Sequence, residues 1–222
     1  MSSLRRLRLN PATPTGARRT AVTALVELPT GQTSQPEEPE LRKITAGLFV
    51  TLDGVVEDPQ NWQFPYYNEQ IGMDVAAQIA ACDTMLFGRR TSEEFAAHWS
   101  KLGSDAPFAD AINGSPKIVA SSTLRSLDWQ NSTLLGGDLM GDLSALKGQA
   151  GKNISVSGSP TLVRSLLELG LLDELHLMIH PIVLGRGKRL FSDKSGVSRL
   201  KLQSCERYDT GVLSAVYVPD VP

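Results

Sequence analysis

The chain has little cysteine, little excess charge and no long apolar run. Its two cysteines, Cys82 and Cys205, are too few for a disulfide framework or a cysteine-based metal site. The formal net charge of −2 provides no field that would gather nucleic acid or an anionic membrane. No apolar run approaches the roughly 20 residues of a membrane span. We therefore expect no nucleic-acid partner, no membrane partner and no metal, and the sparse cysteine is typical of a reducing cytoplasm.

Residues 1–43 lack Phe, Tyr and Trp and contain five prolines. Such a segment buries too little apolar surface to offset its ordering entropy. We predict a disordered N-terminal extension over 1–43 and one compact domain over 44–222. The extension carries five arginines before its first acid, Glu27, which is the composition of a transit peptide. A tail without function, or an over-long start, is the alternative.

From residue 44 onward, short apolar stretches alternate with stretches of helical spacing. The expected strands are 44–52, 84–87, 117–120, 153–157, 174–180, 200–208 and 212–218, and the expected helices are 69–82, 91–99, 138–146 and 159–169. The residues between the last two strands, 209–211, form a hairpin signal. This pattern predicts an α/β fold with a mainly parallel central sheet and a C-terminal antiparallel hairpin.

Two glycines stand where an expected strand meets an expected helix. In such sheets, ligands bind beyond the carboxyl ends of the strands, and a helix N-terminus offers free amides to an anion. The candidate phosphate-binding residues at these two junctions are Gly88, Arg89 and Thr91, and Gly158, Ser159 and Thr161. A capped helix with two solvated arginines is the alternative at the first junction, and a well-capped helix is the alternative at the second.

Hydroxyl and carboxyl groups follow two other strands. Ser121 and Ser122 are candidate phosphate or ribose donors, and they are equally good turn formers. Asp53 ends the first strand, where a carboxylate could bind a polar substrate or assist proton transfer; an ordinary Asp-Gly turn is the alternative. His176 and His180 have the spacing of zinc ligands on a helix. On a strand their Cα atoms lie ~13 Å apart, so we expect no metal there.

In order and spacing, six pieces of the chain resemble the dihydrofolate reductase-like family. They are closest to the reductase domain of bacterial riboflavin biosynthesis, the C-terminal domain of RibD, and its stand-alone relatives. The pieces are TLDG at 51–54, DTMLFGRRT at 83–91, KIVASSTL at 117–124, VSGS at 156–159, LDEL at 172–175 and HPIVLGRGKRLF at 180–191. The resemblance implies an eight-stranded sheet with helices on both faces, often in a homodimer, and NADPH as cofactor.

The resemblance also implies roles for individual residues. Arg89 and Thr91 would contact the adenosine phosphates, and Ser121 and Ser122 would lie near the 2′-phosphate. Gly158 and Ser159 would hold the pyrophosphate. Asp53 would face both the substrate and the nicotinamide and is the first candidate for the proton donor, with water the second. Trp62 would form part of a wall over the substrate unless it is an ordinary core aromatic, and Glu174 would begin the strand that borders the substrate pocket.

The chain departs from a true folate enzyme in two places. The second phosphate loop lacks a basic residue, and residues 61–67 read NWQFPYY where the folate enzyme has a Leu-Pro-Trp motif. We therefore expect a reductase that transfers a hydride from NADPH to an imine or carbonyl of a small polar substrate. That substrate would be riboflavin-pathway-like, as is 5-amino-6-(5-phosphoribosylamino)uracil, or pterin-like. A reductase of another small substrate and a non-catalytic nucleotide-binding module are the alternatives.

Overall fold

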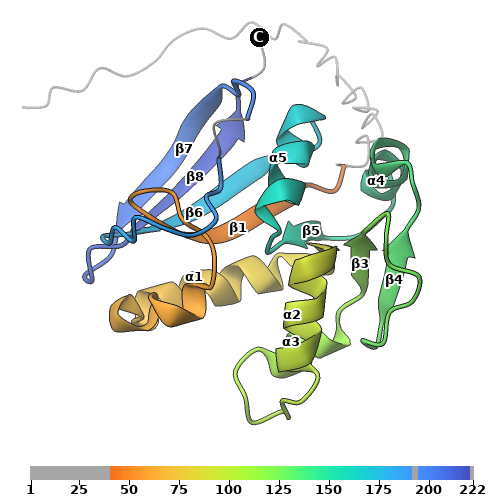
Figure 1. Cartoon of the computed structure of the whole chain (residues 1–222), viewed down its shortest axis with the longest axis horizontal. Helices are drawn as coiled ribbons and strands as arrows, with labels where there is room; N and C mark the ends of the chain where they lie inside the picture. Colours follow the sequence, from red (N-terminus) through yellow and green to blue (C-terminus); the bar gives the residue numbers. More distant parts are fainter. Residues whose placement is uncertain (1–40, 192–194, 221–222) are drawn as a thin grey trace, which may run out of the picture. The chain divides into compact units, whose positions relative to one another are not determined.

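The computed structural model describes residues 41–191 and 195–220, which centre on an eight-stranded sheet (Figure 1). The strands are β1 (Ile44–Thr51), β2 (Cys82–Gly88), β3 (Lys117–Ala120), β4 (Ser132–Leu135), β5 (Asn153–Val156), β6 (Glu174–His180), β7 (Leu200–Arg207) and β8 (Leu213–Pro219). The helices are α1 (Glu69–Ala80), α2 (Arg89–Trp99), α3 (Ala109–Gly114), α4 (Leu139–Lys147) and α5 (Pro160–Glu168). Short 3₁₀ turns η1 (Pro59–Asn61) and η2 (Phe64–Tyr66) precede α1.

The strand order is β4-β3-β2-β5-β1-β6-β8-β7. Neighbours from β4 through β6 are parallel, whereas β8 is antiparallel to both β6 and β7. This confirms the predicted mainly parallel sheet with an antiparallel C-terminal hairpin. The residue pattern alone missed β4 and α3, which are short elements with mixed polarity.

Helices cover both faces of the sheet because side chains alternate along each strand. On β2, Leu86 packs in the cluster that includes Leu143 of α4 and Leu166 of α5. Its neighbour Phe87 points to the other face and packs with residues of α2 and α3. Ile71 of α1 packs on that second face against Met178 of β6. The burial of these apolar side chains holds the two helical layers on the sheet.

Local sequence signals set where the site-forming helices begin. Ser159 caps α5 by accepting a hydrogen bond from the amide of Leu162, and Pro160 occupies the first helical position. Helix α2 begins at Arg89, directly after Gly88 and two residues before the predicted start. Thr91 therefore lies in the first turn of α2 and does not cap it.

The fold includes Arg42, which we had placed in the N-terminal extension. The Arg42 side chain is buried, donates to the hydroxyl of Thr84 at 2.8 Å and to the carbonyl of Lys152 at 2.6 Å, and forms an ion pair with Asp83. The described domain thus begins before residue 44. Residues 1–40, on which most of the disorder prediction falls, lie outside the described residues.

Candidate cofactor and substrate site

The loops that follow five neighbouring strands lie along one edge of the sheet. Because β3, β2, β5, β1 and β6 are adjacent and parallel, their carboxyl ends meet at this edge. Ser121, Gly158 and Asp53 follow β3, β5 and β1, and Gly88 is the last residue of β2. The structure therefore places the predicted phosphate-binding loops side by side.

Gly88 and Gly158 bring the ends of β2 and β5 into direct contact. The amide of Gly88 donates to the carbonyl of Gly158 at 3.4 Å. A Cβ atom on Gly88 would lie 2.7 Å from the Ser159 hydroxyl oxygen, and one on Gly158 would lie 3.2 Å from the Thr91 hydroxyl oxygen. Gly158 also has a φ of 127°, a conformation that side chains disfavour, and the peptide bond that follows it is cis. A side chain at Gly88 would therefore displace the Ser159 hydroxyl, and one at Gly158 would be crowded by Thr91 and strained by the positive φ.

Two helix N-termini meet at this pair of glycines. Helix α2 leaves the end of β2, and α5 leaves the end of β5, the strand beside it. The amides of a first helical turn have no partner within the helix, and they carry positive potential. In the described structure no side chain caps α2, because the residue before the helix is Gly88. The first amides of α2 therefore face the edge without a side-chain acceptor. The arrangement suits an anion with several oxygen atoms.

The arginines of α2 point their charge along the helix surface. Arg89 pairs with Glu93 at 3.4 Å, and Arg90 pairs with Glu94 at 2.9 Å. All four side chains are about half exposed, and exposed pairs of this kind contribute little to stability. A phosphate group could therefore exchange with the carboxylate partner of Arg89 at small cost.

The remaining predicted phosphate ligands have local partners. The Ser121 hydroxyl oxygen accepts from the amides of Thr123 and Leu124, as a turn-forming serine does. Ser122 is exposed beside it. Thr161 in the first turn of α5 is exposed, and its hydroxyl accepts from Arg164 at 3.2 Å. These residues border the glycine pair without contacting it.

Asp53 binds a distant loop. Its carboxylate accepts from the Thr51 hydroxyl at 2.6 Å, from the Gly185 amide at 2.8 Å and from the Leu184 amide at 3.2 Å. Arg189 adds an ion pair at 3.5 Å and donates to the Asp53 carbonyl. The Thr51 hydroxyl contributes most to holding the pKa of Asp53 at about 2; burial opposes it, and the Gly185 and Leu184 amides lower the pKa further. Asp53 is thus ionised at neutral pH.

The loop that Asp53 binds, 181–190, is joined to the segment after β1 over several residues. The Val56 amide donates to the Lys188 carbonyl, and the Leu190 amide donates to the Gly54 carbonyl, both at 2.9 Å. On the other side, Arg164 of α5 donates to the Leu190 carbonyl at 2.6 Å. The loop is therefore fixed between β1 and α5, beside the glycine pair.

Trp62 packs on a buried histidine at the same edge. Its indole N–H donates to the Glu57 carbonyl at 3.0 Å, and its ring meets His180 edge to face at 5.1 Å between centroids. Phe49 and Tyr66 contact the same imidazole at 5.6 and 5.7 Å. His180 is fully buried, and this burial lowers its pKa. Trp62 is therefore both a core aromatic and a neighbour of the candidate site.

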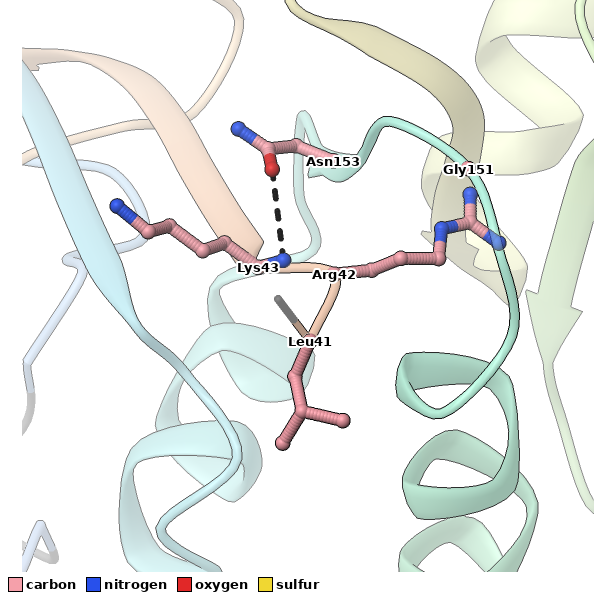
Figure 2. Close-up of a pocket in the computed structure, with 5 residues that line it drawn as sticks. All are labelled: Leu41, Arg42, Lys43, Gly151 and Asn153. Carbon is pink, nitrogen blue, oxygen red and sulfur yellow. Dashed lines mark hydrogen bonds between the residues drawn. The ribbon is translucent and has the colours of Figure 1, made fainter. Parts of the chain in front are cut away.

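Glu174 lies at the opposite edge, because it is the first residue of β6 and His180 is the last. Its carboxylate pairs with Lys43 at 3.1 Å and contacts His176 at 2.9 Å. This end of the sheet carries a shallow hollow whose lining includes Lys43 and Asn153 (Figure 2). Strand direction explains the placement: a residue that begins a parallel strand cannot reach a site at the strand's carboxyl end.

Sequence reasoning missed three residues that shape the edge at the carboxyl ends of the parallel strands. His180 was considered only as a metal ligand, although a histidine in an apolar strand signals a buried polar group. Arg164 and Arg189 give no local signal, because each donates to a main-chain carbonyl distant in sequence. Within the described ranges, no group of three His, Cys, Asp or Glu side chains could hold a metal ion. In the same ranges, no helix has the length and apolar character needed to cross a membrane.

Comparison with known proteins supports the fold and assigns the family. Over 179 residues the chain is 30% identical to the uncharacterized protein YyaP of Bacillus subtilis, covering 79% of this chain and 94% of YyaP. Among solved structures, a protein from Shewanella sp. PV-4 named for riboflavin biosynthesis superposes with a TM-score of 0.67 at 19% identity, covering 81% of this chain and 99% of that one. Dihydrofolate reductase from Enterococcus faecalis, in complex with NADP(H), superposes with a TM-score of 0.51 at 12% identity, covering 81% and 97%. The family model of the RibD C-terminal domain matches residues 42–214. The chain therefore belongs to the RibD C-terminal domain family.

Proposed function

We propose that the chain is an NADPH-dependent reductase of a small polar, nitrogen-containing substrate related to the riboflavin pathway or to pterins. The observation that carries this proposal is the contact between Gly88 and Gly158, where a Cβ atom on either residue would crowd a neighbouring hydroxyl group. Two helix N-termini converge on that contact, which is the arrangement a pyrophosphate needs. Membership of the RibD C-terminal domain family and the fold shared with an NADP(H)-bound reductase support the same function.

The residues present fit a dinucleotide cofactor. The glycine pair provides a close approach to the backbone, and the first turns of α2 and α5 would donate their amides to phosphate oxygens. We call the Gly88–Gly158 contact and the two helix starts beside it the cofactor cradle. Arg89 and Ser122 are exposed beside this cradle and would contact the 2′-phosphate of the adenosine half. When bound, the cofactor would supply a hydride to an imine or carbonyl carbon of the substrate.

Asp53 would act through the loop it holds. Its carboxylate oxygens are engaged by Thr51, Leu184 and Gly185, and a pKa of about 2 leaves it without a proton at neutral pH. We therefore propose Asp53 as a positioning residue that fixes loop 181–190 beside the cofactor. The proton needed by the reduced substrate would then come from water, the second donor suggested by the sequence.

Two experiments test the proposal. NADPH should bind the full chain in a calorimetric titration, and oxidation of NADPH should follow when a suitable carbonyl or imine is supplied. Rescue of a riboflavin auxotroph that lacks its reductase would identify the substrate as that of the riboflavin pathway. Tight NADPH binding without rescue would instead favour another small substrate. Failure to bind NADPH would contradict the proposal.

A further inference from the structure

Close to the proposed cofactor cradle, His180 carries a buried nitrogen atom that has no partner in the described part of the chain. The imidazole is fully buried, and its Nδ1–H donates to the Met178 carbonyl at 2.9 Å. No hydrogen-bond partner for Nε2 lies among residues 41–191 and 195–220. Leaving a buried acceptor unpaired costs free energy, so native proteins rarely retain one without a ligand or a bound water.

The protonation state of His180 fixes what Nε2 can do. A carbonyl accepts only, so the bond to Met178 places the proton on Nδ1. Burial lowers the pKa of the imidazole, and this outweighs the opposing effect of the Met178 and Val50 carbonyls. The ring is therefore neutral, and Nε2 presents a lone pair. Its partner must be a hydrogen-bond donor.

Aromatic side chains surround the His180 ring. The rings of Phe49, Trp62 and Tyr66 meet the imidazole edge to face, at 5.6, 5.1 and 5.7 Å between centroids. Two of them, Trp62 and Tyr66, belong to the irregular segment between β1 and α1, and they reach His180 through short 3₁₀ turns. A donor that takes the place of one of these rings beside the imidazole would itself need a flat apolar face.

The position of His180 places such a donor beside the proposed cofactor. His180 ends β6 and pairs in register with Thr51 at the end of β1. Strand β1 lies between β6 and β5, so two strand spacings, roughly 10 Å, separate His180 from the strand that leads into Gly158. A ring bound at Nε2 and a cofactor bound over Gly158 would be neighbours.

We propose that Nε2 of His180 is the hydrogen-bond acceptor for a ring N–H of the substrate, which enters as a planar heterocycle when Trp62 or Tyr66 moves aside. This inference rests on the proposed reductase function and adds to it the residue that selects the substrate ring. His180 is a binding residue in this role: it takes no part in hydride or proton transfer. Heterocycles without a ring N–H would be poor ligands.

The test uses the full chain with ¹⁵N-labelled histidine and two probes. Lumazine has ring N–H donors, and 1,3-dimethyllumazine has the same rings with those donors methylated. The chain has three histidines, so the spectrum of H180Q assigns the His180 resonances, and H98Q, at an exposed histidine, is the matched control. Lumazine should shift the Nε2 resonance of His180, whereas the dimethyl compound should not.

Affinity gives an independent measurement. H180F keeps an aromatic ring and removes both nitrogens, so it should weaken lumazine binding roughly 2- to 12-fold, the value of one neutral hydrogen bond. H98Q should leave lumazine binding unchanged.

Equal responses to both probes, or no response at Nε2, would show a plain core histidine and overturn the inference. NADPH affinity of the same samples reports separately on the proposed function. If the wild-type chain does not bind NADPH, the proposed reductase function is rejected, whatever shift lumazine causes at His180.

Discussion

The carboxylate of Asp53 accepts a 2.8 Å hydrogen bond from the amide of Gly185, although 132 residues separate the two. This bond joins the turn after β1 to the loop after β6 at the edge where the proposed cofactor would bind. The TLDG sequence at 51–54 and the LGRG sequence at 184–187 look like two unrelated turns. The bond gives them a shared role. The Asp-Gly turn is thus more than a local reversal of the chain.

We expect D53N to lower turnover more than NADPH affinity. Asparagine keeps the size of the side chain, but it loses the charge that attracts Arg189 and one of the acceptor oxygens that hold Leu184 and Gly185. A shift of the loop by about 1 Å could reduce turnover by up to 100-fold. Steady-state kinetics with D58N as control, an exposed aspartate of the same segment, checks this. Unchanged turnover in D53N would remove Asp53 from the site.

The same aspartate should make stability depend on pH in acid. Its pKa is about 2 in the folded protein and 3.8 for the unperturbed group, so the folded state favours the charged form. The resulting stabilisation is complete above pH 3.8 and is lost as the pH falls toward 2. The difference in Tm between wild type and D53N should therefore shrink over that range. A difference that stays constant or grows would contradict the assignment.

G158A should disrupt the cradle. A Cβ atom there meets the Thr91 hydroxyl, and the φ of 127° is unfavourable for alanine, at a cost of about 1–3 kcal/mol. The free energy of unfolding, measured in urea, should fall by that amount, and NADPH affinity should fall with it. G114A is the control, because a Cβ on Gly114 meets no atom within 4 Å. Wild-type NADPH affinity in G158A would place the phosphates elsewhere.

R89A should weaken NADPH more than NADH, because the proposed contact is to the 2′-phosphate. A charge-assisted hydrogen bond of about 1.5–3 kcal/mol corresponds to roughly 10- to 150-fold in affinity. R90A, whose side chain pairs with Glu94 and lies 3.9 Å from Glu57, is the neighbouring control. Equal losses for both nucleotides in calorimetry would show that Arg89 does not read that phosphate.

Truncation separates the predicted tail from the described domain. Removing residues 1–40 should leave Tm nearly unchanged if the extension is disordered. Removing 1–43 should lower it, because Arg42 is buried and its loss removes the ion pair of Asp83 and the donor to the Lys152 carbonyl. Thermal unfolding of the two truncated chains checks this difference. Equal midpoints would mean that Arg42 contributes nothing to the fold.

Much of the fold could be predicted because it rests on local signals. The strand that ends at Gly88 and the capped start of α5 at Ser159 are visible as short patterns, and parallel topology then brings Gly88 and Gly158 together. β4 was missed because Ser132–Leu135 is a four-residue edge strand without a continuous apolar run. Its formation depends on pairing with β3, which no local pattern shows.

The parts of the site that escaped prediction depend on long-range contacts. The engagement of Asp53 requires amides from a loop more than 130 residues away. The burial of His180 requires aromatic rings from β1 and from the segment before α1. Glu174 was placed near the substrate by resemblance, whereas the direction of β6 puts it at the other edge. Residue type indicated chemistry in each case, and topology decided where that chemistry lies.

The most direct test of the cofactor cradle is an NADPH titration followed by the backbone amide resonances of ¹⁵N-labelled protein. The account predicts that the largest shifts fall on the first turn of α2 and on residues 158–162 around the start of α5. Shifts concentrated at the opposite edge, around Arg42 and Asn153, or no shifts at millimolar NADPH, would contradict it.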